Sequence, residues 1–340
     1  MWRHATRDIV FSLVVDDFGI RYTNRDDADH FIATLRQSYD VSLDWTGSRY
    51  CGLTLEWDYE NRTCDMSMPG YIERALQRFK HIAAPKAEHS PHPWQRPTYG
   101  AKTQFAAMPD ESPSLDAADK TRILEVLGTL LFYARAIDST MLTAIGELDT
   151  EQSQATKSTM DKLAQLLNYC AAHPDAVVRF TASDMILAVE SDASYLSVVK
   201  GRSRAAGYFF LTDKLASPTS SYKPNGAVQH ILCHIMREVL SSAAEAKLGA
   251  LFHNGKEACP LRIALEELGH PQSATPMATD NNTELQLTPS NRNGRKRSTC
   301  FLLDPRSGSA RSISDILEQG PDESCRLLFQ ASSRVTSSGH

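Results

Sequence analysis

The order of strand-like and helix-like sequence between residues 185 and 280 is the feature that most narrows the possible folds. Three runs with strand character come first, helical periodicity follows, and a short strand-like run closes the region. The expected strands are 185–190, 206–211, 226–235 and 276–279, and the expected helices are 242–254 and 259–268, interrupted by Asn254-Gly255. This order predicts a mixed sheet with helices packed against it.

The first eighty residues predict a smaller unit of hairpins and short helices. Strands over 11–15 and 20–23 flank the pair Asp16-Asp17, and Asp26 or Asp27 is expected to cap the helix that follows. A strand over 50–57, a polar turn and a strand over 63–66 come next. Ser67 is expected to cap a further helix, which Pro69 opens.

The middle and the end of the chain divide by composition. Residues 85–116 are rich in Pro, His and Ser and predict a linker. Two helical patterns, 117–136 and 152–172, predict a helical unit over 117–175, and strand-like texture begins at 176. Beyond 290 the pattern is lost, which predicts a degenerate or disordered tail over 291–340.

Composition limits the classes of protein to consider. The chain has 340 residues, 41% of them hydrophobic, and a formal net charge of −5. This charge argues against a strongly basic nucleic-acid binder, although a local basic groove remains open. Seven cysteines without a CxxC pair favour a reducing, intracellular setting, and no apolar run predicts a membrane span. Lys200, Arg202 and Arg204 either line nucleic-acid phosphates or belong to a solvated loop.

Three carboxylates are candidates for a metal site. Asp192 follows the first strand of the 185–280 region, Glu245 lies in the first turn of a helix, and Asp280 ends the last strand. Convergence of the three would suit two Mg²⁺ ions, which bind carboxylate oxygens and assist phosphodiester hydrolysis. Each residue alone also has a structural explanation. Glu245 completes a capping box with Ser242, while Asp192 and Asp280 suit turns.

The same region resembles the ribonuclease H domain of copia-like LTR retrotransposons. The resemblance rests on VESDASYLS, SRAAGYFFL, IMREVLSSAAEAKLGALF and ATDN, taken in this order. It implies that Asp192, Glu245 and Asp280 hold a two-ion Mg²⁺ site that cleaves the RNA strand of an RNA–DNA hybrid. The family's helix usually reads Glu-Ala-Glu, and here Lys247 stands at the third position. This reverses a charge close to the expected metals.

Upstream stretches extend the resemblance to roughly residues 9–290. YCGLTLEWDY and MPGYIERALQRF resemble the end of a reverse transcriptase palm and the start of its thumb, and LGTLLFYARAID resembles the helical connection. FSLVVDDFG resembles the catalytic hairpin, so Asp16 and Asp17 are expected to be remnants of a polymerase site. The resemblance therefore implies a palm and thumb remnant over 1–84, a connection over 117–175 and a ribonuclease H domain over 176–290.

Two expectations about activity follow from this resemblance. A polymerase also needs an upstream metal-binding Asp and fingers, and only ten residues precede Phe11, so no polymerase activity is expected from this chain alone. The nuclease half lacks a clear fourth carboxylate, for which Asp304, Asp315 and Asp322 are candidates by residue type. The alternatives are thus Mg²⁺-dependent cleavage of an RNA–DNA hybrid, a catalytically dead relic, or a module that only binds nucleic acid.

Overall fold

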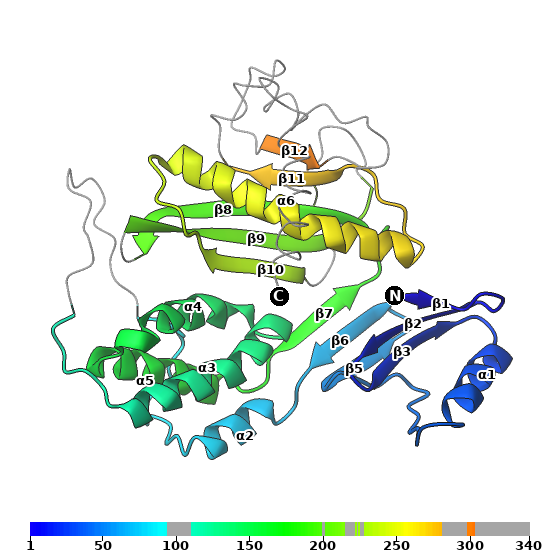
Figure 1. Ribbon diagram of the computed structural model, residues 1–340, viewed down its shortest axis with the longest axis horizontal. Coiled ribbons are helices and arrows are strands. Elements are labelled where there is room, and N and C mark those ends of the chain that lie inside the picture. The colour runs from blue at the N-terminus through cyan, green and yellow to red at the C-terminus, as the bar shows by residue number, and fades with distance from the viewer. Residues whose placement is uncertain are drawn as a thin grey trace, which may run out of the picture.

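The computed structural model describes residues 1–93, 110–198, 201–214, 222, 224 and 228–280, together with the backbone of 298–302. Three β-sheets and a layer of helices make up this part of the chain. The five-stranded sheet and its long helix α6 lie on one side, and the helical layer and two smaller sheets lie on the other (Figure 1). The mixed α/β composition is confirmed, and it is compatible with an RNase H-like fold.

The N-terminal sheet contains the hairpin predicted around the Asp pair. Its strands are β1 (Trp2–Arg3), β2 (Ile9–Val14) and β3 (Asp17–Tyr22), paired in the order β1-β2-β3. Val14 pairs with Asp17, so the turn is the dipeptide Val15-Asp16 and Asp17 is already part of a strand. Helix α1 (Arg25–Leu35) follows, capped by the Asn24 side chain and not by Asp26 or Asp27 as predicted.

The second sheet has the order β4-β5-β6-β7 and joins distant parts of the chain. Its strands are β4 (Arg49–Tyr50), β5 (Leu53–Asp58), β6 (Thr63–Ser67) and β7 (Val177–Thr181). The single strand predicted over 50–57 is wrong, because Cys51 and Gly52 both have positive φ and form a tight turn. The prediction that Ser67 caps a helix is also wrong. Ser67 ends β6, and Gly70 precedes helix α2 (Tyr71–Arg78).

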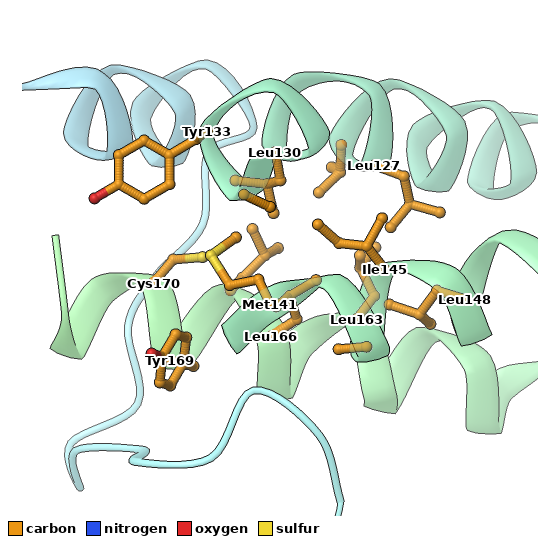
Figure 2. Close-up of a cluster of buried hydrophobic side chains, with 14 of the residues drawn as sticks. Leu127, Leu130, Tyr133, Met141, Ile145, Leu148, Leu163, Leu166, Tyr169 and Cys170 are labelled. Carbon is orange, nitrogen blue, oxygen red and sulfur yellow. The ribbon is translucent and has the colours of Figure 1, made fainter. Parts of the chain in front are cut away.

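The helical layer surrounds the larger apolar core. It comprises α3 (Ala117–Ala136), the 3-10 turn η1 (Ser139–Met141), α4 (Leu142–Glu151), the 3-10 turn η2 (Gln152–Gln154) and α5 (Lys157–Ala172). Figure 2 shows side chains from these helices meeting in one cluster, which includes Leu130, Ile145 and Leu166. The helix predicted over 152–172 starts later, at a capping box of Thr156 and Thr159.

The five-stranded sheet has the strand order β10-β9-β8-β11-β12. Its elements are β8 (Ile186–Val198), β9 (Arg202–Thr212), β10 (Val228–Ile235), α6 (Ala243–Glu267), β11 (Thr275–Thr279) and β12 (Ser298–Leu302). Neighbouring strands are antiparallel except β8 and β11, which run parallel at the centre. Helix α6 crosses one face of the sheet (Figure 1).

Two sequence predictions about this sheet need correction. The helices expected over 242–254 and 259–268 are one helix, α6, which continues through Asn254-Gly255 and contains Pro260. Asn254 is fully buried and its amide hydrogen-bonds to the sheet, so tertiary contacts override the local signal for a turn. Asp192 does not follow its strand but lies inside β8, paired with Ala206.

Parts of the predicted linker and tail lie outside the described residues. Within 85–116, residues 94–109 are not described, and the remainder forms no helix or long strand. Its two ends are held against the helical layer: Leu115 donates its amide hydrogen to the carbonyl of Ala155, and His92 contacts Glu147. The predicted tail falls outside the described residues except for the backbone of β12, and Asp304, Asp315 and Asp322 are among the residues not described.

Candidate functional site

Asp192 and Asp280 lie close together at one end of the central strand pair. The last parallel pair between the two strands is Glu190 with Ala278, and each Asp lies two residues beyond its member of that pair. The side chains of both Asp residues are about two-thirds exposed, at 66% and 64%. The structure therefore brings together two of the three carboxylates that the sequence singles out.

The ammonium group of Lys247 lies between these two carboxylates. Its Nζ contacts Oδ1 of Asp280 directly and lies 3.5 Å from Oδ1 of Asp192. Lys247 comes from the second turn of α6 and its side chain is only 20% exposed. Burial works against the charged form, but the hydrogen bond to Asp280 and the attraction of Asp192 raise the pKa of Lys247 above its usual value. The ammonium is therefore a fixed positive charge at this site.

Glu245 makes local contacts and does not join the Asp pair. Its carboxylate accepts hydrogen bonds of 2.6 Å from both the backbone amide and the hydroxyl of Ser241. Its own amide donates to the Ser242 hydroxyl, 3.1 Å away, as a helix cap requires. The bonds from Ser241 lower the pKa of this exposed Glu. Ser242 therefore caps the helix through the Glu245 amide, but the Glu245 carboxylate bonds to Ser241 and not back to Ser242, so the capping box that the sequence offered as an alternative is only half formed.

The Asp192, Lys247 and Asp280 arrangement does not fit the expected two-ion Mg²⁺ site. Among the residues described, no group of three His, Cys, Asp or Glu side chains is placed to hold a metal ion. Two hard cations need several oxygen ligands held together, and here an ammonium takes the space between the two nearest carboxylates. The third expected ligand, Glu245, is engaged elsewhere.

The expected polymerase remnant lies in a different sheet. Asp16 sits in the exposed turn of the β2–β3 hairpin, and Asp17 begins β3. Asp17 lines an open cavity of about 400 Å³ beside Arg49 and Arg74. Asp16 thus lies at the hairpin tip, whereas Asp17 lies in the strand that follows and lines the cavity together with basic side chains.

The structure describes two of the three basic residues that were expected to line phosphates or to belong to a solvated loop. Lys200 lies outside the described residues. Arg204 is 8% exposed and points into the helical layer, where it pairs with Glu147 at 3.7 Å. Arg202, at the start of β9, is half-buried and stays a candidate for phosphate contact.

Sequence reasoning missed the polar residues that fix α6 against the sheet. Asn254 donates to the hydroxyl of Ser191 (2.8 Å) and to the carbonyl of Ala206 (2.9 Å). Arg262 donates to the hydroxyl of Thr275 (2.7 Å) and to two carbonyls before β11. A buried Arg within an apolar helix pattern could have signalled such contacts, because a buried charge requires partners. The Asn-Gly dipeptide signalled a turn instead.

The chain is similar to a known retroelement polyprotein. No family model matches the chain. It is 22% identical over 325 residues to the retrovirus-related Pol polyprotein from transposon TNT 1-94 of Nicotiana tabacum, an alignment that covers 94% of this chain and 22% of the polyprotein. The chain thus spans about a fifth of that protein's length. The similarity supports an origin in a retrotransposon polyprotein.

Within the described residues, no helix is both long and apolar enough to cross a bilayer.

Proposed function

We propose that this chain is a retroelement-derived protein whose residues 176–290 form a ribonuclease H-like domain that binds RNA–DNA hybrids. The observation that carries the proposal is the strand arrangement. Three antiparallel strands and a later strand that runs parallel to the first lie in a single sheet, which helix α6 covers on one face, and the two parallel strands bring Asp192 and Asp280 close together. The weak similarity to a retrotransposon Pol polyprotein along 94% of the chain supports the same interpretation.

The remaining segments fit the rest of this ancestry. We propose that residues 1–84 are a remnant of a polymerase palm and thumb, and that 117–175 are a helical connection. In support, the Asp16-Asp17 hairpin and the sheet that precedes α2 occur in the expected order. Among the described residues, no third carboxylate joins Asp16 and Asp17 in a group that could hold a metal ion. We therefore propose that this hairpin does not catalyse polymerisation.

Binding to a hybrid is tested directly by fluorescence anisotropy with the full chain. The probes are an RNA–DNA hybrid and a DNA duplex of the same sequence, both labelled on the same DNA strand. We expect tighter binding to the hybrid by about tenfold, and weaker binding to both probes as salt rises, because phosphate contacts release counterions. Equal affinity for both probes, or no binding at low salt, would contradict the proposal.

Arg202 provides a single-residue test of the same proposal. Arg202→Gln is expected to weaken hybrid binding. It should also reduce the slope of log affinity against log salt concentration by about one, which corresponds to one phosphate contact. Lys256→Gln is the matched control, since Lys256 lies on the exposed surface of α6 near Phe252. An unchanged affinity for the Arg202 variant would remove this residue from the proposed surface.

A second candidate function is Mg²⁺-dependent cleavage of the RNA strand by Asp192, Glu245 and Asp280. The similarity to a retrotransposon Pol polyprotein favours it, whereas the Lys247 contacts and the local bonds of Glu245 count against it. The test is a labelled RNA strand in a hybrid, incubated with Mg²⁺ or Mn²⁺ and either the natural protein or Asp192→Asn. Cleavage that is lost in the variant would establish this candidate, and an intact strand with both proteins would reject it.

A further inference from the structure

The carboxylate pair of Asp192 and Asp280 already has a cation supplied by the chain itself. We infer that the Lys247 ammonium is the resident cation of this site. It takes the position that a metal ion would have, so the domain binds no Mg²⁺ there. The inference rests on the proposed ribonuclease H-like domain and deepens it. The domain is then expected to bind an RNA–DNA hybrid without hydrolysing its RNA strand by a metal-assisted reaction.

The register of the central strands fixes the carboxylate pair. Because β8 and β11 run parallel, Asp192 and Asp280 extend the pairing of Glu190 with Ala278 by the same number of residues. The paired strands β8 and β9 continue beyond this point, whereas β11 ends at Thr279. The two carboxylates therefore lie at the same level of the sheet, where the ladder between β8 and β11 stops.

The packing of α6 brings Lys247 to this position. Ala246 and Ala250 are completely buried against core residues of the sheet, including Val189. Asn254 fixes the next turns of the helix through Ser191. Lys247 follows a buried position near the start of α6, and its ammonium reaches both Asp side chains. The contact is thus set by the helix register and not by a freely moving surface chain.

The charges and hydrogen bonds favour the ammonium over a metal ion at this site. Lys247 neutralises one of the two negative charges of Asp192 and Asp280, while Glu245 is satisfied by two bonds from Ser241. A divalent ion would have to displace the ammonium next to the carboxylates and recruit a ligand that is already bonded. An ammonium can bind a phosphate oxygen but cannot activate a water molecule as a metal ion does.

The test measures metal binding without any nucleic acid. Melting temperatures of the full chain are recorded with no Mg²⁺ and with about 10 mM Mg²⁺, for the natural protein and for Lys247→Glu. The variant places a third carboxylate beside Asp192 and Asp280, so Mg²⁺ is expected to raise its melting temperature by about 3 °C through binding to the folded state. The natural protein is expected to show no such shift.

Controls separate the site from general charge effects. Lys256→Glu makes the same charge change on the same helix and should give no Mg²⁺ shift, and adding Asp192→Asn to Lys247→Glu should abolish the shift. If Lys247→Glu does not fold, Lys247→Gln serves in its place, with a smaller shift expected. A shift in the natural protein that disappears in Asp192→Asn would overturn the inference, as would a folded Lys247→Glu without a shift. Hybrid binding is measured separately, so its failure would count against the proposed function alone.

Discussion

Gly207→Ala is the substitution for which the structure gives the clearest expected cost. A Cβ atom added at Gly207 of β9 would lie 1.8 Å from Oδ1 and 2.6 Å from Cγ of Asn254, and 2.9 Å from a ring carbon of Phe209. The Asn254 amide cannot remain in place at these distances, and because Asn254 is fully buried it has no open space to move into. The variant therefore removes the hydrogen bonds from Asn254 to Ser191 and to the carbonyl of Ala206.

The magnitude follows from those two hydrogen bonds. Each buried bond contributes about 1 kcal/mol, and leaving partners unsatisfied costs about 1–3 kcal/mol. The smaller conformational entropy of unfolded Ala offsets about 0.4–1 kcal/mol of this loss. We expect Gly207→Ala to destabilise the five-stranded sheet and α6 by about 2–4 kcal/mol.

Native-state hydrogen exchange of the β9 and α6 amides is the assay, because it reports the stability of this unit separately from the helical layer. A loss of about 3 kcal/mol corresponds to roughly a hundredfold faster exchange. The matched control is Gly128→Ala, an exposed position inside α3 where an added Cβ meets nothing within 4 Å. It should stabilise the protein by about 0.5–1 kcal/mol.

A double mutant makes the reasoning refutable. Asn254→Ala vacates the space that the new methyl group requires, so Gly207→Ala should cost far less in that background. Equal costs of Gly207→Ala with and without Asn254, or no cost in the natural background, would refute the proposed contact.

Three further predictions concern other parts of the molecule. Val15 has φ +57° and is 92% exposed in the hairpin turn, so Val15→Gly should raise the stability of the β2–β3 hairpin by about 1 kcal/mol. Hydrogen exchange of the hairpin amides measures this change, and a loss of stability would contradict a strained turn. Arg262→Met leaves the Thr275 hydroxyl and two carbonyls without their buried donor and should cost about 3 kcal/mol in urea unfolding, whereas the exposed control Arg36→Met should be neutral. The hydrogen bond to Glu147 raises the pKa of His92 in the folded protein above its ordinary value. The stabilisation by this ion pair is therefore complete below pH about 6.5, the unfolded pKa of His, and is lost as the pH rises through the higher pKa of the folded state. His92→Gln should therefore lower the melting temperature at pH about 6 but not at pH about 9, and an equal loss at both would contradict the ion pair.

The elements that sequence alone predicted correctly are those whose local signals agree with their burial. Helix α3 begins and ends at the predicted residues, since Asp116 caps its start and Ile123, Val126 and Leu130 form a continuous apolar face. The β2–β3 hairpin is also present, although its turn is Val15-Asp16 and its second strand begins earlier than predicted, at Asp17.

The errors arose where tertiary contacts outweigh local preference. Asn254-Gly255 has the composition of a turn, yet the Asn amide pairs with the sheet and the helix continues. Asp192 was expected after a strand because its side chain is polar, but pairing with Ala206 extends β8 past it. Short-range patterns carry no information about such partners, which for Asn254 lie 48 and 63 residues away in the chain.

The candidate site was predicted only in part. Residue type and position indicated that Asp192 and Asp280 converge, and they do so because β8 and β11 run parallel and in register, although Asp192 lies inside its strand and not at its end. The sequence also identified the reversed charge at Lys247. It could not predict that this ammonium would contact both carboxylates, because a long flexible side chain is directed by its surroundings and not by its neighbours in the chain.

The most direct test of the account combines binding and cleavage in one gel. An RNA–DNA hybrid with a labelled RNA strand is incubated with the full chain and Mg²⁺, and one half is run native and the other denatured. We expect a retarded hybrid whose RNA strand keeps its full length, because Lys247 takes the place of the metal between Asp192 and Asp280. RNA shortened by the natural protein but not by Asp192→Asn would contradict it.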